Sequence, residues 1–201
     1  MQSLEERARR YASKAHADAG QRRKYTDEPY IVHPAAVVEL VRSVSDDEQM
    51  LAAAWLHDTV EDTTSTGGDL SSHFGERVAA LVAELTNSGD RPGQNRTARK
   101  VAHFEHTAHA SPAAQTIKLA DIIDNTRAII DFDPHFARIY LVEKRLQIAL
   151  LTKGDRQLFN QASQIVEQGI ARLSQPPYNV PPAWFDRQAE KYRQLAHKIG
   201  E

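Results

Sequence analysis

Apolar residues recur at helical spacing along almost the whole chain. In residues 2–18, Leu4, Ala8, Ala12 and Ala15 form one stripe at the three- and four-residue spacing of an amphipathic helix. Alternating runs of β-branched residues bounded by turns, which indicate strands, are missing. Further helices are expected over residues 34–41, 50–56, 76–86, 96–109, 112–130, 134–151, 155–173 and 183–199. The sequence therefore predicts an all-α, multi-helix bundle.

The boundaries between the helices suggest how the chain is organised. Ser45 and Glu48 form a capping-box pattern before residues 50–56, a run that is apolar all round and is expected to be buried. Residues 87–95 are the most loop-like stretch of the chain. Residues 174–182 contain four prolines and predict a stiff linker. We therefore expect one domain over 1–173, followed by a linker and C-terminal helix over 174–201.

Composition and charge exclude several classes of protein. The 201 residues are 41% hydrophobic and 26% charged, with a formal net charge of −2. The basic surplus typical of nucleic-acid binding is absent, so no nucleic-acid partner is expected. Without cysteine, the chain has no disulfide framework, thiolate metal site or thiol nucleophile. No apolar run is long enough to span a membrane and no secretory signal opens the chain, so a cytoplasmic protein is expected.

A dense group of acids and one imidazole follows the predicted buried helix. The segment reads His57-Asp58-Thr59-Val60-Glu61-Asp62, and a continued helix would bring His57 near Glu61 and Asp58 near Asp62. So many acids without a neighbouring Lys or Arg indicate a bound cation, and a His–Asp set suits Mn, Fe or Zn. The alternative is a polar helix end exposed to water, although acids at a helix C-terminus oppose the macrodipole.

Two further positions break the apolar pattern. In residues 112–130, Lys118, Asp121 and Asn125 share one helix face, which makes Asp121 a candidate metal ligand. The alternative is a Lys118–Asp121 salt bridge on a solvated face. His33 immediately precedes Pro34, so its backbone is restricted; the alternative is a structural histidine with its hydrogen bonds satisfied.

These positions together resemble a known family. His33, then His57-Asp58, then Asp121 is the H…HD…D arrangement of the HD-domain phosphohydrolases. Three motifs narrow the resemblance to the hydrolase domain of the RelA/SpoT family in its stand-alone form, the small alarmone hydrolases. They are Gln-Arg-Arg-Lys (21–24) followed by Pro-Tyr-Ile-Val-His-Pro (29–34), Leu-His-Asp-Thr-Val-Glu-Asp-Thr (56–63), and Lys-Leu-Ala-Asp (118–121) followed by Asn125. The resemblance covers residues 4–152, and Ala-Arg-Ile-Tyr-Leu-Val-Glu-Lys-Arg (137–145) also matches the family's later helix.

The resemblance implies a metal-dependent reaction on a small nucleotide. It implies one divalent metal ion, expected to be Mn²⁺, held by His33, His57, Asp58 and Asp121. Glu61 and Asp62 would position the attacking water or accept its proton. The substrate would be guanosine tetra- or pentaphosphate, (p)ppGpp, and the products pyrophosphate and GDP or GTP.

The same resemblance assigns contacts with the nucleotide. Arg23 would stack on the purine, Arg22 and Lys24 would face phosphates, and Asn125 and Tyr140 would contact the nucleoside or its phosphates. For a basic loop such as 21–24 the simpler interpretation is a solvated charge run. The base-recognition loop departs from the family, because Tyr25 stands where Asp is common, and residues 122–124 (Ile-Ile-Asp) replace the usual basic or aromatic spacer.

Three alternatives to this function remain open. Tyr25 favours an HD phosphohydrolase for another nucleotide, such as a nucleoside monophosphate or the 2′-phosphate of NADPH. A non-catalytic nucleotide-sensing module would have lost metal ligands or Glu61 and Asp62, all of which are present. The linker and last helix favour a partner-docking tail, and a homo-oligomer is left open. The chain has no room for the family's synthetase domain, so hydrolysis without synthesis is expected.

Overall fold

The computed structural model describes residues 2–87 and 95–200. Over these residues the chain is helical and contains no strand; a single isolated bridge pairs Arg22 with Pro29. The predicted all-α bundle is therefore confirmed. Residues 88–94 of the predicted loop lie outside the described residues. Over the part of the chain that the structure describes, no helix combines the length and apolar composition that a membrane span needs.

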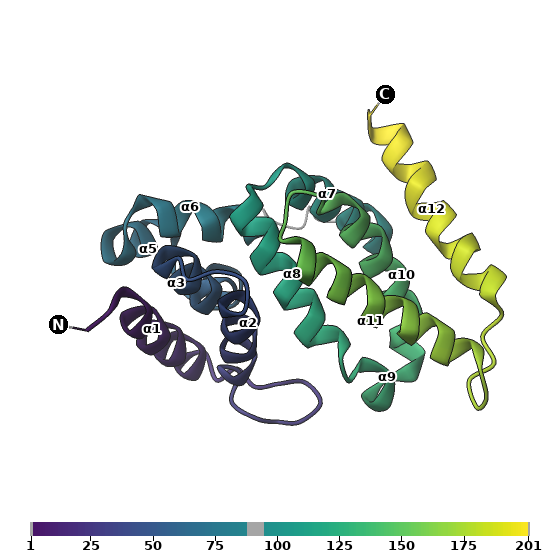
Figure 1. Ribbon diagram of the computed structural model, residues 1–201, viewed down its shortest axis with the longest axis horizontal. Coiled ribbons are helices and arrows are strands. Elements are labelled where there is room, and N and C mark those ends of the chain that lie inside the picture. The colour runs from purple at the N-terminus through teal and green to yellow at the C-terminus, as the bar shows by residue number, and fades with distance from the viewer. Residues whose placement is uncertain (1, 88–94, 201) are drawn as a thin grey trace.

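The helices follow one another along the chain, and a long loop over residues 19–31 connects the first two (Figure 1). They are α1 (Leu4–Asp18), α2 (Val32–Arg42), α3 (Glu48–Leu56), α4 (Thr59–Asp62), α5 (Gly67–Phe74), α6 (Glu76–Leu85), α7 (Arg96–His109), α8 (Pro112–Thr126), α9 (Ile129–Phe132), α10 (Pro134–Leu150), α11 (Arg156–Ser174) and α12 (Pro182–Gly200).

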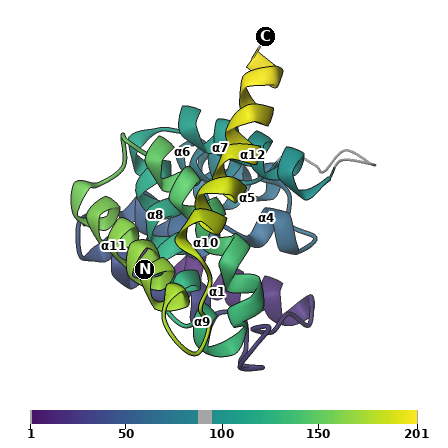
Figure 2. The same cartoon turned by 90° about the vertical axis from the view of Figure 1, so that its right-hand side faces the viewer.

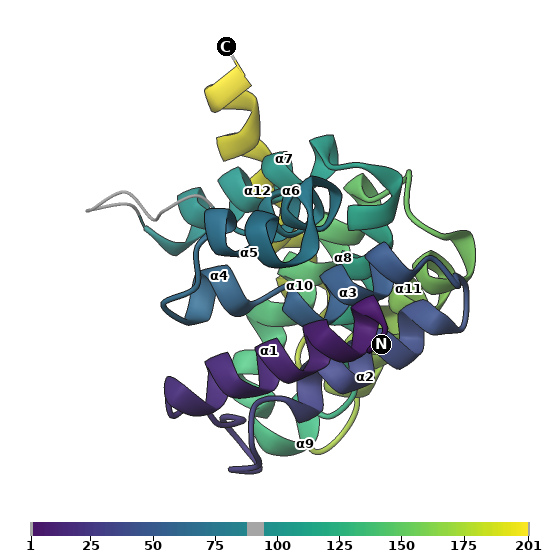
Figure 3. The ribbon, with the colours of Figure 1, turned by 90° about the vertical axis from the view of Figure 1, so that its left-hand side faces the viewer.

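Helices α3 and α8 form the centre of the bundle. All seven residues from Met50 to Leu56 are buried, because α1, α2, α6 and α8 pack around α3. Figure 3 shows α1 and α2 lying beside α3. Helix α8 joins the N-terminal helices to the C-terminal ones, since it contacts α2 and α6 on one side and α11 on the other. The first turn of α2, the C-terminal end of α3 and the C-terminal half of α8 are thereby brought together.

Several predicted boundaries are wrong in detail. The capping box at Ser45 does not form; Asp47 is the N-cap of α3, and its carboxylate accepts hydrogen bonds from the backbone N–H groups of Gln49 and Met50. Helix α2 begins at Val32, so Pro34 occupies its third position rather than its first. The predicted helix 112–130 is two helices, because α8 ends at Thr126 and α9 begins at Ile129.

The C-terminal helix lies against the body of its own chain. Figure 2 shows α12 running across α10, and it also contacts α7. Val180, Phe185, Ala189 and Tyr192 are buried in this contact. The predicted partner-docking tail is therefore wrong for these apolar residues, because they are already covered within the chain.

Candidate functional site

The His57–Asp58 pair occupies a break between two helices. Helix α3 ends at Leu56 and α4 begins at Thr59, whose hydroxyl donates to the Leu56 carbonyl at 2.7 Å. The predicted helix end at residue 56 is confirmed, but the helical spacing expected to bring His57 near Glu61 is interrupted, since a local side-chain hydrogen bond competes with the helical pattern. The turn brings both side chains to the same place, with His57 Nε2 3.0 Å from Asp58 Oδ2.

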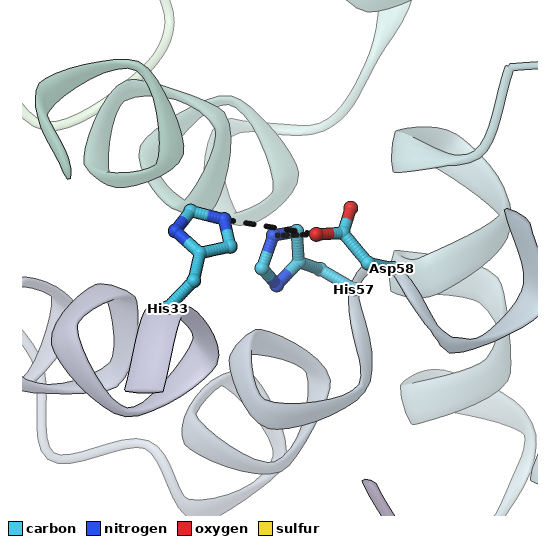
Figure 4. A group of neighbouring side chains, drawn as sticks. All are labelled: His33, His57 and Asp58. Atoms are coloured by element: carbon cyan, nitrogen blue, oxygen red, sulfur yellow. Dashed lines mark ion pairs between the residues drawn. The ribbon is translucent and has the colours of Figure 1, made fainter. Parts of the chain in front are cut away.

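Helix α2 supplies the next member of the group. His33 lies in the first turn of α2, and its Nε2 is 3.6 Å from Asp58 Oδ2. Figure 4 shows both imidazoles directed toward the Asp58 carboxylate. The three residues each offer one donor atom within 4.8 Å of the others.

Helix α8 brings a second carboxylate to the same point. Asp121 Oδ1 lies 3.3 Å from His33 Nε2. His33, His57 and Asp58 thus form one group of donor atoms, and Asp121, far away in the sequence, reaches this group through its contact with His33.

The two imidazoles are held in the way that is common for metal ligands. His57 Nδ1 donates to the Ala54 carbonyl at 2.8 Å, and His33 Nδ1 lies 2.6 Å from Asp124 Oδ2. Both Nε2 atoms are buried and have no hydrogen-bond partner. Metal-ligating histidines commonly donate one ring N–H to a carbonyl or carboxylate and bind the ion with the other nitrogen. Two free imidazole nitrogens beside two carboxylates fit a divalent ion of the Mn, Fe or Zn type.

The electrostatics of the cluster also favour a cation. Burial lowers the pKa of His33, but the adjacent carboxylates of Asp121, Asp124 and Asp58 outweigh it and raise the pKa to about 9. Burial raises the pKa of Asp121, yet the Lys118 ammonium and the His33 side chain hold it well below its usual range. Without an ion, the carboxylates of the site therefore favour protonation of its histidines. A metal ion would compete with these protons for the same imidazole nitrogens.

Neighbouring side chains orient the carboxylates. Tyr30 donates its hydroxyl to Asp58 Oδ2 at 2.6 Å, and Lys118 donates to Asp121 Oδ2 at 2.8 Å. The Lys118–Asp121 pair weighed as an alternative does form, but Asp121 is buried rather than on a solvated face. Sequence reasoning missed the roles of Tyr30 and Asp124. Their signals were the Pro-Tyr-Ile-Val-His-Pro motif and the three-residue spacing of Asp124 from Asp121.

A cavity of about 460 Å³ opens over this cluster. Asp58 and Asp121 lie in its lining, as do Glu61 and Asp62 from α4. Glu61 and Asp62 are exposed, and the Glu61 carboxylate accepts from the side-chain amide of Asn87 at 3.1 and 3.2 Å. The two predicted proton acceptors therefore lie at the edge of the cavity, where water reaches them.

Four of the five predicted substrate-binding residues line the cavity. Arg23, Lys24, Asn125 and Tyr140 do so, and Arg23 Nη1 donates to Asn125 Oδ1 at 3.1 Å. Arg22 does not, because its guanidinium turns away and pairs with Asp27 at 2.8 Å. The prediction that Arg22 faces phosphates is therefore not supported by this arrangement.

An aromatic wall closes one side of the cavity. Tyr25 and Phe132 stack with ring centroids 5.5 Å apart and planes 2° apart. Both rings line the cavity together with Phe136, and the Lys24 ammonium lies 4.7 Å from the Tyr25 ring centroid. The cavity therefore combines an acidic metal-type cluster, several cations and flat apolar surface, which suits a phosphorylated ring compound.

Comparisons with known proteins agree with this picture. The family model described as HD domain matches residues 8–148. A guanosine-3′,5′-bis(diphosphate) 3′-pyrophosphohydrolase of Aquifex aeolicus is 32% identical over 144 residues, which are 72% of this chain and 19% of that protein. The mouse protein named guanosine-3′,5′-bis(diphosphate) 3′-pyrophosphohydrolase MESH1 is 40% identical over 116 residues, 56% of this chain and 63% of that one. The chain thus spans less than two thirds of these two relatives.

A solved structure extends the similarity to the fold. It is named "A metazoan ortholog of SpoT hydrolyzes ppGpp and plays a role in starvation responses". The two chains superpose with a TM-score of 0.73 at 31% identity, over 84% of this chain and 96% of the other.

Proposed function

Because this chain belongs to the HD domain family, we propose that it is a metal-dependent hydrolase that removes pyrophosphate from the 3′ position of (p)ppGpp. One observation carries the proposal: the buried Nε2 atoms of His33 and His57 face the carboxylates of Asp58 and Asp121, and these carboxylates line a cavity together with cations and aromatic rings. The names of the similar Aquifex and mouse proteins support the choice of substrate.

We assign one divalent ion, proposed to be Mn²⁺, to His33, His57, Asp58 and Asp121. When bound, such an ion lowers the pKa of a ligated water and neutralises charge on phosphate oxygens. The chain's own contribution is to fix the ligands, through Ala54 and Asp124 behind the histidines and Tyr30 and Lys118 beside the carboxylates.

Glu61 and Asp62 are the proposed proton acceptors. They lie on the cavity edge one short turn beyond Asp58, and the Asn87 amide holds the Glu61 carboxylate in place. Water attacks the phosphorus bonded to the ribose 3′-oxygen, and its proton passes to this acidic pair. The bond from phosphorus to the 3′-oxygen breaks, the 3′-oxygen takes up a proton, and GDP or GTP leaves with pyrophosphate. Two adjacent acids share such a role as a pair, so no single base is assigned.

The nucleoside is assigned to the aromatic and basic side of the cavity. Arg23 presents a planar guanidinium that can stack on a purine, and Asn125 holds it by a 3.1 Å hydrogen bond. Lys24 and Tyr140 complete this side of the cavity. A nucleotide substrate of this type also supports a cytoplasmic location.

A second candidate is hydrolysis of a different nucleotide. The Tyr25–Phe132 stack favours it, because parallel rings offer a surface for any flat base and no hydrogen bonds that distinguish guanine. A nucleoside monophosphate and the 2′-phosphate of NADPH are the competing substrates.

A substrate panel separates the two candidates. Purified protein is incubated with Mn²⁺ and ppGpp, pppGpp, GMP or NADPH, and the products are separated by ion-exchange chromatography. We expect equal amounts of pyrophosphate and GDP from ppGpp, and no turnover by the His57→Ala variant. Release of phosphate from GMP or NADPH, with none from ppGpp, would reject the alarmone assignment and favour the second candidate.

A further inference from the structure

Lys144 differs from the other cations of the cavity. Among the described residues that line it, three cations have a carboxylate oxygen within 4.0 Å: Arg23 with Asp124 at 3.5 Å, Lys24 with Asp133 at 3.9 Å, and Lys118 with Asp121 at 2.8 Å. The Lys144 ammonium instead donates to the neutral amide oxygen of Gln147 at 3.0 Å. Among the described residues of the cavity wall, Lys144 is therefore a cation with no carboxylate oxygen at ion-pair distance.

The surroundings of Lys144 disfavour its charge. It lies on α10 one turn after Tyr140, and its Nζ is 5.3 Å from the Tyr140 ring centroid. Burial first, and then the nearby positive charge of Lys118, lower the pKa of Lys144 to about 7. An apolar side chain would fill the same space without this penalty. A charged lysine in such a position becomes favourable when a ligand brings an anion to it.

The position of Lys144 indicates which anion. Asp121 faces the metal-type cluster with Oδ1 and holds the Lys118 ammonium with Oδ2. Lys118 in turn lies close enough to Lys144 to affect its pKa. Lys118 on α8 and Lys144 on α10 thus both line the cavity that contains Asp121. A phosphate at the reacting centre would place a second, linked phosphate toward Lys144.

We propose that Lys144 binds the terminal phosphate of the 3′-diphosphate and so makes this chain select a 3′-diphosphate over a 3′-monophosphate. The inference rests on the proposed hydrolysis of ppGpp and assigns a specificity-determining residue to that site. Lys118, already paired with Asp121, is left to hold the carboxylate, whereas Lys144 is available to the substrate.

The test compares two nucleotides that differ only in the terminal phosphate. The catalytic efficiency kcat/KM is measured for ppGpp, and the inhibition constant for its 3′-monophosphate analogue, ppGp, is measured as a competitor. In the Lys144→Met variant we expect kcat/KM for ppGpp to fall ~10–100-fold, the loss typical of removing a charged hydrogen-bond donor. The inhibition constant of ppGp should stay within about threefold, because that ligand lacks the phosphate in question.

Two further variants control for folding and for charge. Lys144→Arg keeps a cation and should retain most of the kcat/KM that Lys144→Met loses. Lys191→Met removes an exposed lysine of α12, outside the cavity, and should match the wild type. The inference is overturned if both Lys144 variants lower the kcat/KM for ppGpp and raise the inhibition constant of ppGp by the same factor. It is also overturned if kcat/KM for ppGpp is unchanged in both variants. A wild-type protein that releases no pyrophosphate from ppGpp would instead reject the proposed function.

Discussion

Asp124 lies behind His33, on the opposite side of the imidazole from Asp58 and Asp121. Its carboxylate accepts from His33 Nδ1 at 2.6 Å, which keeps the proton on that nitrogen and leaves Nε2 free. Replacing Asp124 with Ala removes this restraint on both the tautomer and the ring orientation. Partners of this kind typically contribute 10–100-fold to metal affinity, so we expect a loss of about that size.

A direct Mn²⁺ binding titration of Asp124→Ala, without substrate, measures the loss. Asp131→Ala is the matched control, because that exposed carboxylate on α9 pairs with Arg172 away from the cluster. An unchanged affinity in Asp124→Ala would contradict the role given to Asp124.

Lys144 makes a separate prediction about stability and pH. Its pKa is about 7 in the folded chain, where burial and the charges of Lys118 and Lys100 outweigh Asp121 and Glu143, against an ordinary value of 10.5. The unfolded chain therefore binds more protons between these pH values, so the lysine becomes less destabilising as pH rises.

Lys144→Met should be more stable than the wild type at pH 7, and the difference should shrink toward pH 10.5. Denaturant unfolding of the substrate-free proteins at several pH values measures this difference. Parallel stability profiles for the two proteins would show that Lys144 is not held in a disfavoured charged state.

The metal cluster could be predicted from the sequence to a large extent. His33, His57, Asp58 and Asp121 stand out as polar residues within apolar segments; the structure groups the first three, and Asp121 contacts His33 of that group. The roles of Asp124 and the other supporting residues could not be predicted, because they depend on contacts between helices. For Arg22 the sequence suggested a contact that the structure does not show. Its positive charge suggested a phosphate contact, but its guanidinium pairs with the neighbouring Asp27.

At the level of helices, the apolar run before His57 correctly predicts a buried element. Its predicted end at residue 56 is also confirmed, since α3 ends at Leu56. The break that follows, which separates His57 from Glu61, was not predictable from periodicity, because it depends on the Thr59 hydroxyl donating to the Leu56 carbonyl. The same limitation applies to residues 112–130, where apolar periodicity continues across the real boundary between α8 and α9.

Close packing between α8 and the start of α11 depends on Gly154. A Cβ atom there would lie 2.7 Å from Leu119 Cδ1 and 3.2 Å from the Gln115 backbone carbon. The Leu119 side chain can move, but the α8 backbone cannot do so without disturbing the helix that carries Asp121. We expect Gly154→Ala to lower the free energy of unfolding by ~1–3 kcal/mol, the usual range for overpacking.

Gly67→Ala is the control for this substitution. A Cβ atom at Gly67, in the first turn of α5, meets nothing within 4 Å. Denaturant unfolding should therefore place Gly67→Ala at or above the wild-type stability. Similar losses in the two variants would mean that the contact between α8 and Gly154 is not tight.

For the molecule as a whole, helical periodicity was sufficient to predict the all-α class but not the position of the C-terminal helix. The sequence shows α12 as an amphipathic helix after a proline-rich linker, and only the structure shows that its apolar side faces α7 and α10. The division at residue 173 stays a prediction, although Tyr192 donates to the buried Glu143 at 2.7 Å across that boundary.

Tyr192→Phe tests whether this contact joins the C-terminal helix to the hydrolase bundle. Glu143 keeps its two hydrogen bonds from Arg96, both 2.8 Å long, so only one of three is lost. We expect the free energy of unfolding to fall by about 1–2 kcal/mol, whereas Lys191→Met on the exposed face of α12 should change it by less than about 0.5 kcal/mol. Identical unfolding curves for the wild type and Tyr192→Phe would indicate that α12 does not pack on α10 in solution.

The central claim is that one ion at the four-residue cluster drives pyrophosphate release. Its most direct test is a titration of metal-stripped protein with Mn²⁺, at a protein concentration well above the metal dissociation constant, with pyrophosphate release from ppGpp followed at each point. We predict a rate that rises in proportion to added Mn²⁺ and levels off at one equivalent per chain, and no rise in His57→Ala. Pyrophosphate release that is independent of Mn²⁺, or that is equal in His57→Ala, would contradict the account.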